Sequence, residues 1–182
     1  MNRLYVITFC LIFLSCQEVV TNHNSNLYEY DVEEKIAQLN ISLPTLGKPV
    51  ANYVHAVKTG NLVFLAGKGP RNENREIIKG KLGSDLDIET GYAAARFVGI
   101  DQLSALKDEI GDLNKVVRIV KVLGMVNADS NFTEHSKVIN GYSDLMVEVF
   151  GERGKHARAA IGMGSLPNNM ACEIEMIVEV RD

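Results

Sequence analysis

Tryptophan is absent from this chain of 182 residues, and cysteine, histidine and proline are scarce, with three, four and four residues. The cysteines Cys10, Cys16 and Cys172 form no CxxC pair and the histidines are scattered, so we expect no metal site. No phosphate-binding glycine loop or nucleotide fingerprint is present either, and we expect no cofactor. Positive charge is limited, because 19 Lys and Arg stand against 23 Asp and Glu. This acidic balance argues against a dedicated nucleic-acid-binding protein.

The sequence has one long apolar run, and it lies at the N-terminus. Residues 4–14 follow a single basic residue, Arg3, and are too few to span a bilayer comfortably, which is typical of the core of a signal peptide. The run ends in Ser15-Cys16, which resembles the processing box of bacterial lipoproteins, where the cysteine is lipidated. A simple cleaved secretory signal is the alternative.

Both alternatives predict an exported chain, either periplasmic or anchored to a bacterial membrane through a lipid on Cys16. We assign residues 1–15 to the signal peptide. Residues 16–30 are mostly polar and are predicted to be a flexible tether. Residues 31–182 are long enough for one domain, and no stretch indicates a protein with several membrane spans.

Hydrophobic periodicity in the domain predicts an α+β fold with two main helices over one sheet. Capping-box spacing marks the start of a short helix at Asp31 and of a later helix at Asn131. The period-two alternation of the last strand predicts one packed face, with Cys172 as a core residue. The expected elements are a helix at 31–39, a hairpin of 53–57 and 61–66, a helix at 87–110, a strand at 116–126, a helix ending before Gly151, and strands at 157–163 and 172–180.

Two charged residues near the end of the chain are candidates for chemistry. Arg158 lies in an otherwise uncharged strand, where its guanidinium needs a partner or water. It could form a structural salt bridge with a strand glutamate, or it could bind a ligand carboxylate through two parallel hydrogen bonds. Glu173, which we expect on a neighbouring strand, could belong to a solvated strand face or act as a general acid/base across the ligand from Arg158.

Other residues are weaker candidates. The ring of Tyr53 could simply pack on the core, and Gly67 could serve a turn or allow a ligand close to the backbone. Asn140 lies on a predicted helix and needs a hydrogen-bond partner, either backbone or ligand. His156 is interpreted as a surface or interface residue.

Together these residues resemble the RidA/YjgF family, also called the endoribonuclease L-PSP family. The resemblance covers roughly residues 33–180, and the segment from Asn140 to Leu145 is more similar to a divergent branch than to the best-studied members. The matching motifs are Tyr53-Val54, Gly60-Asn61-Leu62, Ala66 to Pro70, Ala157-Arg158, Leu166-Pro167 and Glu173-Ile174-Glu175.

The resemblance implies a chorismate-mutase-like fold with a mixed β-sheet and a homotrimer with three clefts between subunits. The helix-free sheet face would meet the neighbouring subunits and carry both Arg158 and Glu173. Family members hydrolyse reactive enamines and imines, such as 2-aminoacrylate, to 2-keto acids and ammonia. By resemblance, Arg158 would bind the substrate carboxylate, Glu173 would activate water, the Gly67 backbone would contact the amine or the water, and Tyr53 and Asn140 would line the cleft.

This chain differs from the family pattern at two positions near the predicted site and in where it is expected to meet its substrate. Ala160 stands where the family often has Cys, and Lys68 stands where it often has Gln, which adds a cation near the cleft. The family's known substrates arise in the cytosol, whereas this chain is expected to be exported. We consider three functions: an imine/enamine deaminase, a non-catalytic trimeric binding protein for small carboxylates, and a ribonuclease. The acidic charge of the chain argues against the ribonuclease.

Overall fold

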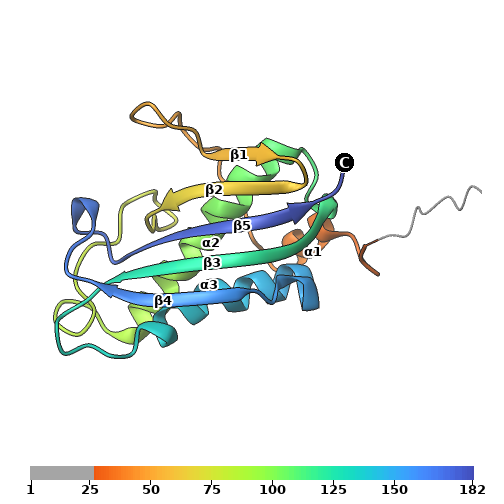
Figure 1. Cartoon of the computed structure of the whole chain (residues 1–182). Helices are drawn as coiled ribbons and strands as arrows, with labels where there is room; N and C mark the ends of the chain where they lie inside the picture. Colours follow the sequence, from red (N-terminus) through yellow and green to blue (C-terminus); the bar gives the residue numbers. More distant parts are fainter. Residues whose placement is uncertain (1–26) are drawn as a thin grey trace, which may run out of the picture.

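The computed structural model describes residues 27–182. The predicted signal peptide, Cys16 and most of the predicted tether therefore lie outside the described residues. Five strands form one mixed sheet in the order β1-β2-β5-β3-β4 (Figure 1). Their bounds are Ala56–Thr59 for β1, Leu62–Lys68 for β2, Val116–Asn127 for β3, Ala157–Met163 for β4 and Cys172–Val180 for β5.

Two long helices, α2 (Ile88–Ile110) and α3 (His135–Phe150), lie side by side on one face of this sheet (Figure 1). The helix α3 connects β3 to β4, the only parallel pair among the described strands, as a parallel pair requires a crossover. No described helix covers the opposite face, which we call the open face. The α+β prediction, with a mixed sheet and two main helices on one face, is confirmed.

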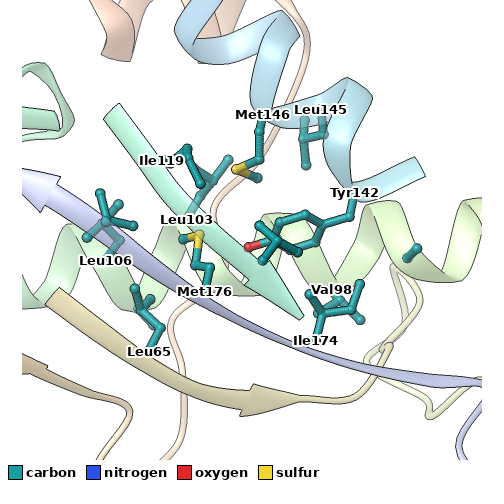
Figure 2. Close-up of a cluster of buried hydrophobic side chains, with 14 of the residues drawn as sticks. Leu65, Val98, Leu103, Leu106, Ile119, Tyr142, Leu145, Met146, Ile174 and Met176 are labelled. Atoms are coloured by element: carbon teal, nitrogen blue, oxygen red, sulfur yellow. The ribbon is translucent and has the colours of Figure 1, made fainter. Parts of the chain in front are cut away.

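The core lies between the two helices and the sheet. In β5, alternate side chains point into it, so the predicted period-two pattern is confirmed. Cys172 is among them as a free, fully buried thiol, and burial raises its pKa to about 12. Figure 2 shows part of this cluster, including Leu103, Leu106, Met146, Ile174 and Met176.

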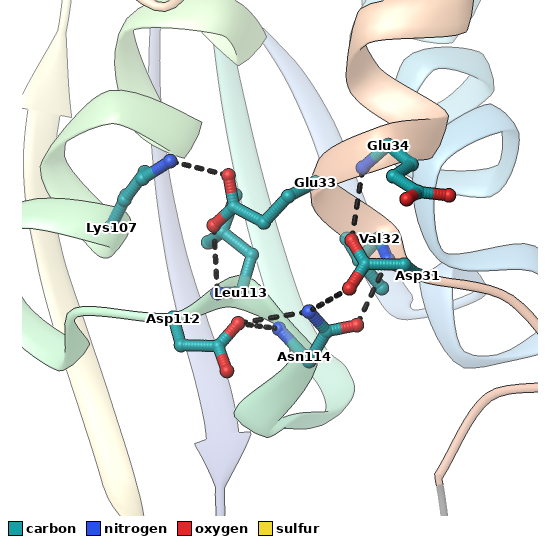
Figure 3. A network of polar contacts seen from close by, with 8 residues as sticks. All are labelled: Asp31, Val32, Glu33, Glu34, Lys107, Asp112, Leu113 and Asn114. Carbon is teal, nitrogen blue, oxygen red and sulfur yellow. Dashed lines mark hydrogen bonds and ion pairs between the residues drawn. The ribbon is translucent and has the colours of Figure 1, made fainter.

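The short helix α1 (Val32–Gln38) is fixed to the turn before β3 by polar contacts (Figure 3). The predicted cap is confirmed, since Asp31 Oδ1 accepts a hydrogen bond from Glu34 N at 2.9 Å. The Asn114 side chain accepts from Val32 N at 2.9 Å and donates to Asp31. Glu33 accepts hydrogen bonds from Lys107 Nζ and from a backbone N–H of the same turn. The first helix is therefore part of the packed domain.

Residues 27–30 also pack on the domain, although the sequence analysis places them in the tether. Tyr28 donates its hydroxyl to Val116 O at 2.6 Å, and its ring lies 5.6 Å from the Arg153 guanidinium. Tyr30 donates to Val149 O at 3.0 Å. The segment before α1 is thus packed beside the start of β3.

Two predicted element starts are corrected. Strand β1 begins at Ala56 rather than Tyr53. Helix α3 begins at His135, and no side chain caps it. Asn131 does not cap this helix, because its backbone and side-chain nitrogens both donate to Asp129 in a turn before it. The helix 87–110 and the strands β3, β4 and β5 match their predicted positions within one residue.

Candidate functional site

A cleft of about 600 Å³ opens where β2 ends, beside the start of β5. Three of the predicted site residues, Tyr53, Gly67 and Glu173, line it together. Tyr53 comes from the segment that leads into β1 and is 50% exposed, so its ring borders the cleft instead of packing in the core. Arg158 and Asn140 are not among the lining residues.

Gly67 and Glu173 are in close contact. The regular pairing of β2 with β5 is interrupted between Leu65 and Lys68, which places Gly67 in a bulge. The Gln102 amide bridges the interruption by donating to Ala66 O at 3.0 Å and to Ile174 O at 2.8 Å. A Cβ at position 67 would overlap Oε1 of Glu173 and lie 3.1 Å from its Cδ. Only glycine leaves room for this carboxylate against the backbone.

The carboxyl of Glu173 has the properties of a proton-transfer group. It is half-buried, and burial, followed by the nearby Glu175 carboxylate, raises its pKa above the ordinary value. No cationic side chain of residues 27–182 lies within ion-pair distance of it. An unpaired carboxyl with a raised pKa in a cleft is suited to exchange protons with a ligand.

With Glu173 as the predicted general acid/base, replacing Gly67 by Ala is expected to reduce substrate turnover without unfolding the protein. The added methyl displaces the Glu173 carboxylate, which is the end of a flexible side chain and can move at little cost. We expect at least a tenfold lower kcat/KM, since misplacement of a catalytic group by about 1 Å costs about 100-fold. Circular dichroism should show a native melting transition, and unchanged kcat/KM would contradict the assigned contact.

Arg158 and Asn140 lie together at a different place. Arg158, on β4, donates from Nη1 to Asn140 Oδ1 at 2.9 Å and to Ser143 Oγ at 2.9 Å, both on α3. No carboxylate of the described range lies within ion-pair distance of Arg158, so the structural salt bridge considered above is not formed. Both bonds use one nitrogen, and the remaining N–H groups of the guanidinium have no bond to any described residue.

The expectation that Arg158 and Glu173 lie on neighbouring strands and on one sheet face is wrong. Strand β3 separates β4 from β5. Arg158 aligns with Val122, a fully buried residue of the helix-covered face, whereas Glu173 aligns with Met125, three residues further along β3. Because side chains alternate along a strand, the two charged groups point to opposite faces. Within one chain they cannot hold the same small ligand.

Sequence reasoning missed the residues that position Arg158. Ser143 lies one turn from Asn140 on α3, and its Oγ is 3.0 Å from His156 Nε2. His156 Nδ1 lies 2.7 Å from Gly154 O, so Nδ1 donates to this carbonyl and Nε2 accepts from the serine. His156 is thus a half-buried member of this cluster and not a free surface residue; the predicted interface position stays a prediction. The spacing of three between Asn140 and Ser143 could have indicated a shared helix face.

Burial lowers the pKa of His156 below its ordinary value; the hydrogen bond to Gly154 O acts in the opposite direction, and the Arg158 charge adds to the lowering. The downward shift favours the neutral imidazole. If Arg158 binds a carboxylate as the sequence predicts, Ser143→Ala should weaken this binding by about fivefold or more, because a net hydrogen bond contributes about 1 kcal/mol. Titration calorimetry with pyruvate measures this effect. Ser143→Thr, which keeps the hydroxyl, is the matched control and should retain most of the affinity; equal losses in both variants would argue against the hydroxyl's role.

No group of three or more His, Cys, Asp and Glu side chains in residues 27–182 is placed to hold a metal ion. Within the same range, no helix has the length and apolar character to cross a membrane.

Comparison with known proteins agrees with this architecture. Residues 33–180 match the family described as "YjgF/chorismate mutase-like, putative endoribonuclease". The protein TCP17 of Trypanosoma cruzi is 39% identical over 152 residues, which cover 83% of this chain and 95% of that protein. The fold is also similar to the crystal structure of Atu1372 from Agrobacterium tumefaciens, a protein of unknown function, with a TM-score of 0.75 and 38% sequence identity. The match covers 82% of this chain and 94% of the Atu1372 chain.

A third relative has a named activity. The 2-iminobutanoate/2-iminopropanoate deaminase of the mite Dermatophagoides farinae is 28% identical over 141 residues, which cover 77% of this chain and 94% of the mite protein. These similarities, together with the open sheet face and the cleft at the β2 bulge, define the class of protein. The chain belongs to the YjgF/RidA family, as the sequence motifs indicated.

Proposed function

We propose that this protein hydrolyses small carboxylate-bearing imines and enamines, of the 2-aminoacrylate type, to 2-keto acids and ammonia. The observation that carries the proposal is the half-buried, unpaired carboxyl of Glu173 against the Gly67 backbone in the cleft. The similarity to a named imine deaminase supports the same reaction class.

The reaction needs little beyond one positioned water and one proton carrier. Glu173 takes a proton from the water as its oxygen forms a bond to the imine carbon, which is already electrophilic. Glu173 passes this proton to the nitrogen, which gives an amino-alcohol. The carboxylate then takes the hydroxyl proton as the C=O bond forms and the carbon–nitrogen bond breaks, and it delivers this proton to the departing nitrogen, which leaves as ammonia. One imine and one water give one keto acid and one ammonia. The Gly67 backbone keeps the water or the amine close to the carboxyl, and Tyr53 borders the same cleft.

A second copy of the chain supplies the carboxylate site in this proposal. Arg158 lies on the edge strand β4 and keeps guanidinium N–H groups free for a fork-shaped contact, with Asn140 holding its Nη1. Because Glu173 faces the other way, the ligand would lie between Glu173 of one copy and Arg158 of the next. A closed ring of three such contacts is a homotrimer with three equivalent clefts.

The open sheet face supports association between copies. Large apolar side chains on β1, β2 and β4 stand exposed there: Val57, Phe64 and Ile161 are 52%, 42% and 42% exposed. Their strand register directs all three away from the helices. Exposed apolar surface of this kind is typical of an interface between protein chains.

The test is imine decay in the presence of the purified full-length protein. An amino-acid oxidase generates 2-iminopropionate from alanine in situ, and the loss of the imine is followed with and without the protein. Faster decay that scales with protein concentration supports a deaminase. A folded trimer that binds pyruvate but leaves the decay rate unchanged would contradict hydrolysis and indicate the carboxylate-binding alternative.

We further propose that the chain is exported through residues 1–15 and anchored by a lipid on Cys16. In a bacterial host, the mature protein is expected in the membrane fraction, with a mass increased by the acyl groups. Cys16→Ser should move it to the soluble fraction while the domain remains folded. Mass spectrometry of both fractions checks this, and an unmodified soluble wild-type protein would leave the simple cleaved signal as the explanation.

A further inference from the structure

Gln102 on α2 is a buried amide that contacts both strands of the cleft. Its side chain is fully buried, and Nε2 donates one hydrogen bond to Ala66 O at 3.0 Å and one to Ile174 O at 2.8 Å. Both acceptors are backbone carbonyls, which cannot donate, so the NH2 group of the amide must face the sheet. The side chain thus joins the helix layer to β2 and β5 at one point.

The two carbonyls belong to the neighbours of the residues that meet in the cleft. Ala66 precedes Gly67 in β2, and Ile174 follows Glu173 in β5. The regular pairing of the two strands is interrupted here, and a bulge leaves a residue outside the ladder of hydrogen bonds. The Gln102 amide therefore fixes the separation of the strands where their own pairing does not.

The contact between Gly67 and Glu173 leaves little room for a change in this separation. The space that a Cβ on residue 67 would occupy already contains Oε1 of Glu173. Helix α2 can hold the strands because residues 101–106 are each at most 4% exposed. Gln102 acts from the helix-covered face while Glu173 points to the open face, so the amide reaches the carboxyl only through the backbone.

Packing alone does not account for an amide at this position. Gln102 Oε1 is buried and accepts no hydrogen bond from residues 27–182. An unpartnered buried oxygen lowers stability, and an apolar side chain of the same size would fill the space without it. What the amide adds is the pair of hydrogen bonds beside the cleft.

We propose that Gln102 is a positioning residue: by holding β2 and β5 together at the interruption, it keeps the Glu173 carboxyl against Gly67 in the geometry for proton transfer. The expected effect on turnover rests on the proposed imine hydrolysis, whereas the effect on the carboxyl itself requires no reaction. Since Gln102 does not touch the substrate, its loss should lower kcat and change KM little.

The test replaces Gln102 by Met, which has nearly the same length and volume but no N–H group. Carbon-13 NMR titration of the glutamate carboxyls in the full-length protein measures the pKa of Glu173, whose signal is assigned by its loss in Glu173→Gln. We expect this raised pKa to fall toward its ordinary value in Gln102→Met, because a carboxyl released from the Gly67 backbone is better solvated. An unchanged pKa would overturn the inference.

The matched control is Leu106→Ala. Leu106 is fully buried one turn further along α2, and its truncation leaves a cavity that lowers the melting temperature without removing a bond to either strand. It should leave the pKa of Glu173 unchanged. An equal fall in both variants would show that a loosened core moves the carboxyl, and would also overturn the inference.

A second variant and a kinetic measurement complete the experiment. Gln102→Asn keeps a buried amide but is one methylene shorter, so it should show the same fall in the pKa of Glu173 if Gln102→Met does not fold; an unchanged pKa rejects the inference there too. In imine hydrolysis, kcat of the folded variant should fall by about tenfold or more. If no imine is hydrolysed by the wild type but the pKa falls as expected, the proposed function fails and the positioning of Glu173 by Gln102 stands.

Discussion

Glu173→Gln is expected to lower kcat for imine hydrolysis by about 10²- to 10⁴-fold, the usual contribution of a positioned general acid/base. The amide occupies nearly the same volume beside Gly67 but cannot take a proton from water. Substrate affinity should change little, because the proposal assigns the substrate carboxylate to Arg158 and not to Glu173. Stopped-flow measurement of imine decay gives kcat and KM separately, and a variant with nearly full kcat would remove Glu173 from the mechanism.

The pH dependence of the proposed hydrolysis by the wild-type protein provides a second check on Glu173. Its pKa is raised above 4.5 by burial and by Glu175, and only the ionised form can accept the proton of water. The kcat/KM profile should therefore fall on its acid side through a pKa above 4.5, and this limb should disappear in the residual activity of Glu173→Gln. Because burial penalises the ionised carboxyl, the variant should unfold at neutral pH at an equal or higher temperature than the wild type.

Arg158→Ala is expected to lower kcat/KM by at least 100-fold, because a charge-assisted fork contact to the substrate carboxylate is lost. Folding should be preserved, since the guanidinium is partly exposed and bonds only to Asn140 and Ser143 among the described residues. Thermal melting serves as the control. Full turnover by the variant would contradict a carboxylate-binding role for Arg158.

Mixing the two inactive variants tests whether the site is shared between chains. In the proposed trimer, co-expressed Arg158→Ala and Glu173→Gln chains would form clefts that combine an intact Glu173 with an intact Arg158 of a neighbour. Random assembly of equal amounts restores about a quarter of the clefts. We therefore expect about a quarter of wild-type activity from the mixture and almost none from either variant alone. A mixture that stays inactive would show that the opposite faces of the sheet do not cooperate.

The elements of the fold could be predicted from the sequence because their signals are local. The cap at Asp87 and the left-handed backbone at Gly111, with a φ of +79°, mark the two ends of α2. The alternation in β5 likewise reports the buried face directly. The cap predicted at Asn131 is the exception. Both nitrogens of Asn131 donate to Asp129, two residues earlier, and α3 begins only at His135.

The site could be predicted only in part, because its geometry depends on pairing between distant segments. The motif that contains Arg158 and Glu173 identifies both residues but not the insertion of β3 between their strands, nor the parallel register that turns Arg158 toward α3. Lys68 lines the cleft, and its Nζ lies 3.0 Å from His55 Nδ1. This contact depends on the path of the chain before β1, where no periodic pattern exists. The residues able to carry chemistry could thus be predicted from the sequence. Their hydrogen-bond partners became visible only in the three-dimensional structure.

The segment before α1 is fixed to the domain at the end of the sheet away from the cleft, which bears on how the protein can be attached to a support. Tyr28 bonds to Val116, which pairs with Val180 at the far end of β5 from Glu173. At about 3.4 Å per residue, the strand separates these ends by roughly 24 Å. A domain held by its N-terminal side, through a lipid or through an engineered tag on a bead, would present the cleft outward. Immobilised protein should therefore remain as accessible to substrate as protein free in solution.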